Sequence, residues 1–159
     1  MPLSKELAMS PEEIDTFMET CVNMRIATFS PGGRINVTPL WYGWAGGKVY
    51  TICRGQKVRN LRRNSNATVI VDRNELFYEL QGVMLQGQAT VLEDAEAEAA
   101  DPDLEEARLQ MGKKYSTSND TSELPRNSAT ASGRTRRWVV FKPEGVVTWD
   151  NTKNPALKG

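Results

Sequence analysis

The sequence predicts a mainly β domain of the α+β class, a Greek-key barrel of six or seven antiparallel strands with two or three flanking helices. Short stretches rich in Val, Ile, Thr, Tyr and Trp recur along the chain, with Gly, Pro, Asn and Asp between them. Most of the intervals suit hairpin connections, which make neighbouring strands antiparallel. Closing such a sheet removes its exposed edges. We expect the 159 residues to form a single domain, 1–159.

The charge balance and the hydropathy exclude two classes of partner. There are 20 basic and 20 acidic residues, so the formal net charge is +0, whereas a nucleic-acid-binding protein normally carries a basic excess. No apolar run approaches the roughly 18 residues of a membrane span, and the N-terminus lacks the apolar core of a signal peptide. The sequence therefore predicts a cytoplasmic protein with no nucleic-acid and no membrane partner.

The chain contains no histidine, and this decides which chemistry is open to it. Ser-His-Asp and Cys-His nucleophile systems, His-containing zinc sites and His-ligated haem are all excluded. Cys21 and Cys53 are too isolated for a disulfide framework or a zinc site, so we expect no metal and interpret both as small buried apolar residues. If the protein is an enzyme, we expect a cofactor to carry the chemistry.

The N-terminal part predicts a helix followed by strands. A capping box that begins at Ser10 starts the helix, which should run to about Val22. We then expect a strand, a turn and one long strand at 25–29, 30–33 and 34–44. Because proline cannot donate to a ladder, Pro39 marks an edge strand, a bulge or a place where the sheet opens.

The middle of the chain predicts a hairpin, a basic helix and two more strands. The turn at 45–47 leads into a strand at 48–53, after which Val58 and Leu61 fall at helical spacing. This helix should start at 54–56 and end before a strand, a turn and a long strand at 67–71, 72–75 and 80–92. Gly82 and Gly87 lie inside the last strand and predict bulges or the close approach of another backbone.

The C-terminal part predicts a helical region, a polar loop and a closing hairpin. The helical region at about 93–115 is interrupted at Asp101-Pro102. Residues 116–133 are rich in Ser, Thr, Asn and Asp, and we interpret this insert as a simple loop or as a lid. Strands at 138–141 and 146–149, joined by a turn at 142–145, complete the fold. The polar tail at 151–159 should fray unless a partner subunit orders it.

The junction between the strand at 48–53 and the basic helix has the features of a phosphate site. Free backbone N–H groups, the positive end of a helix dipole and several cations should meet there. The alternative is that Lys57, Arg59, Arg62 and Arg63 are only the solvated face of a surface helix.

Three stretches carry a resemblance to a known family, V-T-P-L-W-Y at 37–42, T-I-C-R-G-Q-K at 51–57 and K-V-R-N-L-R-R at 57–63. In this order they resemble the pyridoxamine 5'-phosphate oxidase-like FMN-binding split β-barrel superfamily. More narrowly, they resemble its actinobacterial branch, which uses the deazaflavin coenzyme F420. A late Lys-Pro pair and a Trp-Asp pair, Lys142-Pro143 and Trp149-Asp150, match the family loosely.

The resemblance implies a homodimer with two cofactor sites at the subunit interface. It places the cofactor phosphate against Thr51, Arg54, Lys57, Arg59 and Asn60. It places the flavin or deazaflavin ring along Val37, Thr38, Pro39 and Trp41. The partner chain is expected to add residues such as Trp138, Arg137 or Trp149.

The function implied is that of a coenzyme F420-dependent oxidoreductase acting on a conjugated small molecule. Arg34, Arg62 and Arg63 could hold the charged tail that distinguishes coenzyme F420 from FMN. The chain lacks the C-terminal histidine of true pyridoxamine-phosphate oxidases, which argues against vitamin B6 oxidation. The alternatives are an FMN-binding flavoprotein oxidoreductase, a non-catalytic carrier of F420, flavin or a tetrapyrrole, and an RNA-associated barrel, which the zero net charge makes the weakest.

Overall fold

The computed structural model describes residues 5–116 and 136–157, so the predicted insert lies outside the described residues except for Ser116. One seven-stranded sheet has the order β2-β1-β5-β6-β7-β4-β3, and every neighbouring pair is antiparallel. The predicted α+β fold with an antiparallel barrel-like sheet is confirmed. The strands are β1 Met24–Phe29, β2 Ile35–Leu40, β3 Tyr42–Ala45, β4 Lys48–Cys53, β5 Asn66–Arg73, β6 Gln81–Val91 and β7 Arg137–Asp150.

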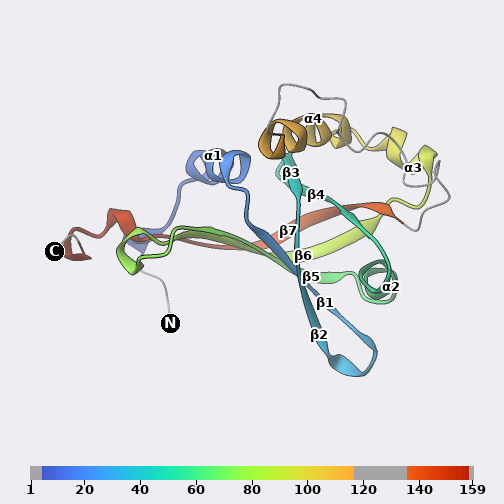
Figure 1. Ribbon diagram of the computed structural model, residues 1–159, viewed down its shortest axis with the longest axis horizontal. Helices are drawn as coiled ribbons and strands as arrows, with labels where there is room; N and C mark the ends of the chain where they lie inside the picture. Colours follow the sequence, from blue (N-terminus) through green and yellow to red (C-terminus); the bar gives the residue numbers. More distant parts are fainter. Residues whose placement is uncertain (1–4, 117–135, 158–159) are drawn as a thin grey trace.

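Helices flank the sheet on two sides. In Figure 1, α1, α3 and α4 lie on one side of the strongly curled sheet and α2 lies on the other. Within the described part of the chain there are four α-helices, where the sequence predicted two or three. They are α1 Pro11–Thr20, α2 Gln56–Arg63, α3 Ala95–Ala100 and α4 Leu104–Tyr115. Short 3-10 turns are η1 Lys5–Leu7, η2 Pro31–Gly33, η3 Phe77–Glu79, η5 Asn151–Lys153 and η6 Pro155–Leu157.

The predicted single strand at 34–44 is wrong, because Trp41 interrupts it and separates two strands; we call this interruption the break. Residues before the break form β2, which pairs with β1, and residues after it form β3, which pairs with β4. These two strands are the opposite edges of the seven-stranded sheet. One residue thus joins both edges, which requires the sheet to curl round on itself. Pro39 lies on edge strand β2, one of the three places that its missing N–H allows.

The predicted turn at 142–145 is also wrong, because β7 runs through it without a break. Gln86 pairs with Gly145 while Gly87 pairs with Pro143, which leaves Glu144 as the extra residue of a β-bulge. A Cβ on Gly87 would lie 2.1 Å from the carbonyl oxygen of Lys142, so the strands approach closely here. The turn-like Lys-Pro-Glu-Gly sequence therefore forms a bulge within a long strand.

Smaller expectations are met or shifted by a few residues. The capping box is present, since the N–H of Ser10 donates to Glu13 and the N–H of Glu13 donates to Ser10. The predicted turn at 72–75 begins later, because β5 continues through Arg73, and Asn74 takes the positive φ of 73°. No helix in the described residues is long and apolar enough to cross a membrane.

The core has two parts that share the sheet. The larger part joins buried residues of α1, of α2 and of the sheet, with Met18, Val58, Leu61, Val69 and Leu85 among them. The smaller part packs α4 against β4 and β7, around Tyr50, Leu104, Met111, Trp138 and Val140. Both cysteines are free and buried, as expected.

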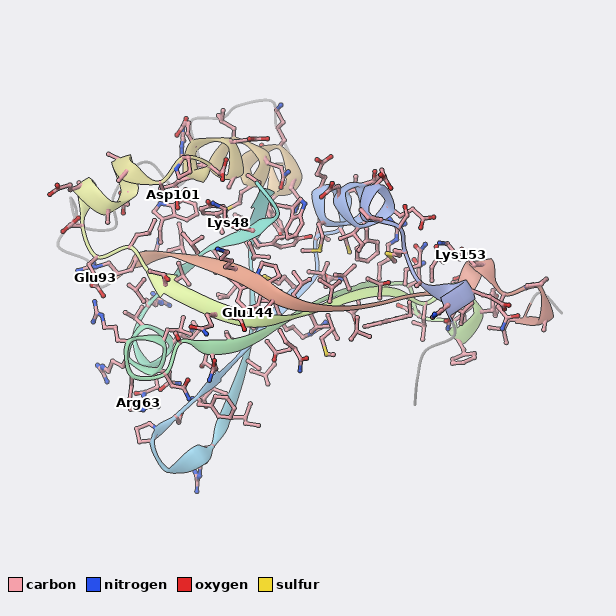
Figure 2. All side chains as sticks on the ribbon, turned by 180° about the vertical axis from the view of Figure 1, so that it is seen from behind. Lys48, Arg63, Glu93, Asp101, Glu144 and Lys153 are labelled. Atoms are coloured by element: carbon pink, nitrogen blue, oxygen red, sulfur yellow. The ribbon has the colours of Figure 1, made fainter. Side chains whose placement is uncertain are left out.

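Helix α4 is fixed to the β3–β4 hairpin by close backbone contact and by side chains. A Cβ on Gly43 would lie 2.2 Å from the carbonyl oxygen of Ala107, so only glycine permits this approach. Gln110 Nε2 donates to the carbonyl of Trp44 at 2.7 Å. Lys48, on the same hairpin and labelled in Figure 2, forms a 2.8 Å ion pair with the Asp103 carboxylate. The helix is thereby held over the strands that follow Trp41.

The first part of the C-terminal tail is tied to the body. Asn151 is buried and its Nδ2 donates to the carbonyl of Phe77 at 2.6 Å. Lys153 Nζ lies 2.6 Å from the Glu13 carboxylate, at the end of the molecule remote from α2 (Figures 1 and 2).

Candidate functional site

The junction between β4 and α2 is built around Gly55. Its φ of 63° and ψ of −131° suit glycine, and no side chain caps the helix. The first turn of α2 therefore keeps backbone N–H groups without a side-chain acceptor. The buried face of the helix carries Val58, Asn60 and Leu61, which sets the opposite face outward. The predicted strand-to-helix junction is confirmed.

A cavity of about 520 Å³ lies beside this junction. Its lining comes from the end of β2, the break, the end of β4, the start of α2, α4 and the segment before β7. The lining residues are Thr38, Leu40, Trp41, Ile52, Cys53, Arg54, Lys57, Met111 and Arg136. We call it the first cavity. Three of these side chains are cationic and none of the residues named is acidic, so the cavity favours an anion.

Four of the ten predicted site residues meet in the first cavity, namely Thr38, Trp41, Arg54 and Lys57. The other six do not line it. Val37 points outward from β2 and is 61% exposed, and Arg59 is exposed on α2. Pro39 lines a neighbouring cavity, and Trp138 is buried in the smaller core.

The two remaining predicted residues are buried, and each forms a hydrogen bond that holds a segment next to the site. Thr51 is fully buried and its hydroxyl donates to the carbonyl of Trp41 at 2.6 Å. The amide of Asn60 is also buried and lies 3.1 Å from the hydroxyl of Thr28 on β1. Thr51 thus fixes the break between β2 and β3, and Asn60 joins α2 to the β1–β2 hairpin.

The ring of Trp41 is held in place by Tyr115 at the end of α4. The two rings are stacked, with centroids 4.7 Å apart and planes 6° from parallel. The Tyr115 hydroxyl donates to the carbonyl of Val22 at 2.9 Å and accepts from the N–H of Tyr42 at 3.3 Å. Trp41 remains 60% exposed, so a fixed aromatic surface faces the outside.

None of the three cations expected to hold a charged tail lies at the first cavity, and two of them, Arg62 and Arg63, are engaged elsewhere. Arg62 donates through two nitrogens to the Glu93 carboxylate, at 2.7 and 2.5 Å, and this pairing raises the pKa of the guanidinium. Arg63 donates to the carbonyl of Phe29, and Arg34 is exposed after the η2 turn.

Cys53 is the one thiol at the first cavity among the described residues. Burial raises its pKa to about 12, an effect that the nearby Lys57 charge opposes only in part. The thiol is therefore neutral at physiological pH and is not a nucleophile. The described residues contain no group of three or more His, Cys, Asp or Glu side chains that could hold a metal ion.

Sequence reasoning missed Met111, Tyr115 and Arg136. The first two lie on α4, 70 and 74 residues after Trp41 along the chain, and reach the site because Gly43 lets the helix approach β3. Arg136 lies directly before β7 and belongs to none of the three stretches that carry the resemblance. No local pattern marks any of them as part of a site.

The arrangement suits a phosphorylated ligand with a flat ring. Arg54, Lys57 and Arg136 supply charge at one side of the first cavity, next to the start of α2. Leu40, Ile52 and Met111 supply apolar surface. Within residues 5–116 and 136–157, edge strand β2 pairs only with β1, so backbone groups along its other side are open to a ligand.

The solved structures that resemble this chain share its fold. Conserved hypothetical protein Rv2991 from Mycobacterium tuberculosis matches with a TM-score of 0.74 and 21% identity, covering 96% of this chain and 92% of that chain. A protein named F420 reductase matches with a TM-score of 0.60 and 19% identity, covering 87% and 98%. The heme storage protein HutZ from Vibrio cholerae matches with a TM-score of 0.61 and 16% identity, covering 87% and 94%. At these identities the likeness shows the fold alone.

No curated protein sequence matches the chain. The family model described as "Pyridoxamine 5'-phosphate oxidase" matches residues 10–150, which is most of the sequence and includes every residue that lines the first cavity. The chain therefore belongs to the pyridoxamine 5'-phosphate oxidase family.

Proposed function

We propose that the protein is an oxidoreductase of the F420-dependent branch of this family, which transfers hydride between coenzyme F420 and a conjugated small molecule. The observation that carries the proposal is the first cavity, where cations at the start of α2 meet apolar side chains and the open edge of β2. The sequence motifs of the chain resemble those of the F420 branch, and a protein named F420 reductase shares the fold.

The cofactor phosphate is proposed to bind at Arg54 and Lys57, with Arg136 closing the same side. A charge-assisted hydrogen bond to a phosphate contributes about 1.5–3 kcal/mol. The N–H groups of the first turn of α2 add donors that no side chain caps. The donor set therefore fits a phosphate monoester or diester.

The ring is proposed to lie along β2 and the break at Trp41. The open edge of β2 near Thr38 offers backbone donors and acceptors to a pyrimidine edge. Leu40, Ile52 and Met111 exclude water from the ring. When bound, the deazaflavin supplies or accepts the hydride, and the described residues bind and orient it without providing a nucleophile.

Two alternatives for the same cavity have support. FMN carries the same phosphate and a similar ring, and none of Arg34, Arg62 and Arg63 lies at the first cavity to favour a longer charged tail. A non-catalytic carrier of F420, flavin or a tetrapyrrole is favoured by one observation. The cavity's ionisable side chains are three cations and a neutral thiol, which do not form an acid–base pair. The heme storage protein HutZ shares the fold.

We also propose that the protein is a homodimer whose two copies meet at the outer face of β1 and β2. Ile35 and Val37 on edge strand β2 are 62% and 61% exposed, and Phe29 lies directly opposite Ile35 on β1. An apolar surface of this kind on a sheet edge is typical of an interface. A second copy there would lie beside Thr38 and could close the first cavity.

The experiment that tests the proposed function is a pair of fluorescence titrations of the purified protein, one with coenzyme F420 and one with FMN. Saturation by coenzyme F420 with little response to FMN supports the proposal. Preference for FMN would assign the protein to the flavin alternative. Binding of neither would refute both and leave only the family and the fold.

A further inference from the structure

A second cavity, of about 600 Å³, also borders Trp41. It is lined by Val22, Asn23, Met24, Arg25, Pro39, Leu40, Trp41, Lys114 and Tyr115. Leu40 and Trp41 line both cavities, so the two sites share a wall. Small-molecule sites have volumes of about 300–1,000 Å³. The second cavity therefore has room for a compound of one or two rings.

One wall of the second cavity is a rigid aromatic surface. The Trp41 and Tyr115 rings lie within 6° of parallel, and Tyr115 is anchored through its hydroxyl to the backbone of Val22 and Tyr42. The carbonyl of Trp41 is held by Thr51. A surface fixed from three elements loses little entropy when a flat ligand packs on it.

The charges at the second cavity are positive. Arg25 and Lys114 line it, and none of its lining residues is acidic. Arg25 is paired with the Asp72 carboxylate at 2.7 Å, and both side chains are partly exposed, so its attraction for a ligand is reduced. Lys114 has no carboxylate within salt-bridge distance among the described residues, which makes it the stronger anchor for an anion.

Lys114 lies in an unusual environment for an amine. Its Nζ donates to the carbonyl of Met18 at 2.8 Å and lies 3.5 Å from the centre of the Tyr42 ring. Burial lowers its pKa to about 7, while the neighbouring Cys21 and Glu19 oppose the shift. The facing groups are thus Glu19 and Cys21 beyond Met18, Tyr42 on β3 and Tyr115 on its own helix.

We propose that the second cavity binds a planar aromatic carboxylate, whose ring packs on the Trp41–Tyr115 surface and whose anion is attracted by Lys114. The first cavity is the better binding site for a phosphorylated cofactor, because three cations and the start of α2 lie together there. That the carboxylate is the compound reduced or oxidised rests on the proposed function, since the shared wall would place it next to the ring. The binding site itself does not depend on that function.

The test uses the protein without cofactor and two matched probes, 2-naphthoate and the neutral 2-naphthylmethanol. Isothermal titration calorimetry at pH 6 should show that 2-naphthoate binds about tenfold more tightly, as one charge-assisted contact implies. Between pH 6 and pH 8 the preference should decline, because Lys114 loses its proton near pH 7. Burial raises the pKa of Cys21 and of Tyr115, to about 12 for the latter, so neither gains charge below pH 8.

Substitutions separate the contributions of the ring surface and the amine. Lys114→Met should abolish the preference for 2-naphthoate, and Trp41→Leu should weaken both probes about tenfold. Lys113→Met is the matched control, because Lys113 is exposed on the same helix and does not line the second cavity. Equal affinity of the native protein for the two probes, or an unchanged preference in Lys114→Met, would overturn the proposal.

The failure of this proposal can be told from the failure of the proposed function. Naphthoate binding without any response to coenzyme F420 or FMN would support the second cavity and refute the function. Cofactor binding without a preference for the carboxylate would support the proposed function and refute the carboxylate site in the second cavity. The pH dependence in the native protein needs no variant, so it holds as a test even if Lys114→Met does not fold.

Discussion

The hydroxyl of Thr51 on β4 donates to the carbonyl of Trp41 at 2.6 Å, which ties the strand next to edge strand β3 to the residue that joins both edges of the sheet. Thr51 is fully buried, so this bond is shielded from water. It sets the position of the wall that the two cavities share. A buried polar contact therefore supports the candidate site although it is not itself in it.

Replacing Thr51 tests that relationship. Thr51→Val keeps the volume but removes the donor, and leaves the Trp41 carbonyl without this partner. We expect the free energy of unfolding to fall by about 1–2 kcal/mol, together with weaker ligand binding in both cavities. Denaturant unfolding and the titrations described above measure the two effects. Thr51→Ser keeps the hydroxyl and is the control; if it binds ligands no better than Thr51→Val, the bond does not position Trp41.

A comparison of Lys57 with Arg59 tests whether the cofactor binds in the first cavity or only to the charged surface of α2. Both were predicted from the sequence to bind phosphate, but only Lys57 lines the first cavity. Lys57→Ala should weaken binding of the phosphorylated cofactor by about 1.5–3 kcal/mol, while Arg59→Ala should leave it unchanged. Fluorescence titration with whichever cofactor binds the native protein measures both. An equal loss in the two variants would mean that the helix attracts the cofactor only through its general charge.

The sequence predicted the β4–α2 junction because its signals are local. Strand alternation stops after Cys53, a glycine follows, and Val58 and Leu61 mark the buried face of the helix. The break at Trp41 has no such signal, because residues on both sides are good strand formers and only their pairing partners differ. At the bulge around Glu144, by contrast, the sequence carries a local signal that is misleading, and it predicted a turn. Its Pro and Gly suit a turn, and the close approach of Gly87 is visible only in the folded sheet.

The walls contributed by α4 depend on distant contacts as well. Tyr115 reaches Trp41 because Gly43 lets α4 lie against the backbone of β3. Helical periodicity gave the helix correctly, but periodicity does not say which strand a helix will cover. The second cavity, which this contact creates, was therefore not predictable.

The proposed dimer interface can be tested at Val37. Val37→Asp places a charge in the exposed apolar surface of β2, and burying an unpaired carboxylate at an interface is unfavourable. We expect the variant to be a folded monomer where the native protein is a dimer, as measured by light scattering after size-exclusion chromatography. Phe77→Asp is the control, since Phe77 is 67% exposed at the remote end of the molecule. A monomeric native protein would contradict the proposal outright.

The environment of Lys114 predicts how stability depends on pH. Its pKa of about 7 in the folded protein lies below the roughly 10.4 of an unfolded chain, so the unfolded state binds more protons between these values. The contribution of Lys114 to stability should therefore rise with pH from 7 to 10 and be lost as the pH falls back towards 7. One pKa unit corresponds to about 1.4 kcal/mol, so the effect should be several degrees in melting temperature.

The native protein is compared with Lys114→Met to isolate this group from the other lysines. The melting temperature of the native protein relative to that of the variant should be higher at pH 10 than at pH 7. Lys113→Met, on the exposed side of the same helix, should show a difference that does not change with pH. A constant difference for Lys114→Met would mean that its amine is solvated in the folded protein.

The bulge between β6 and β7 gives a prediction about the fold itself. A Cβ on Gly87 would lie 2.1 Å from the carbonyl oxygen of Lys142, a backbone atom that cannot move without shifting β7. Gly87→Ala should therefore lower the free energy of unfolding by about 2–4 kcal/mol, measured by denaturant unfolding. Gly145→Ala lies in the same bulge, but its Cβ would meet only Gln86 Oε1 at 3.9 Å and should change stability by less than about 1 kcal/mol. If the two variants were equally stable, the close approach of the strands at Gly87 would not be a feature of the protein in solution.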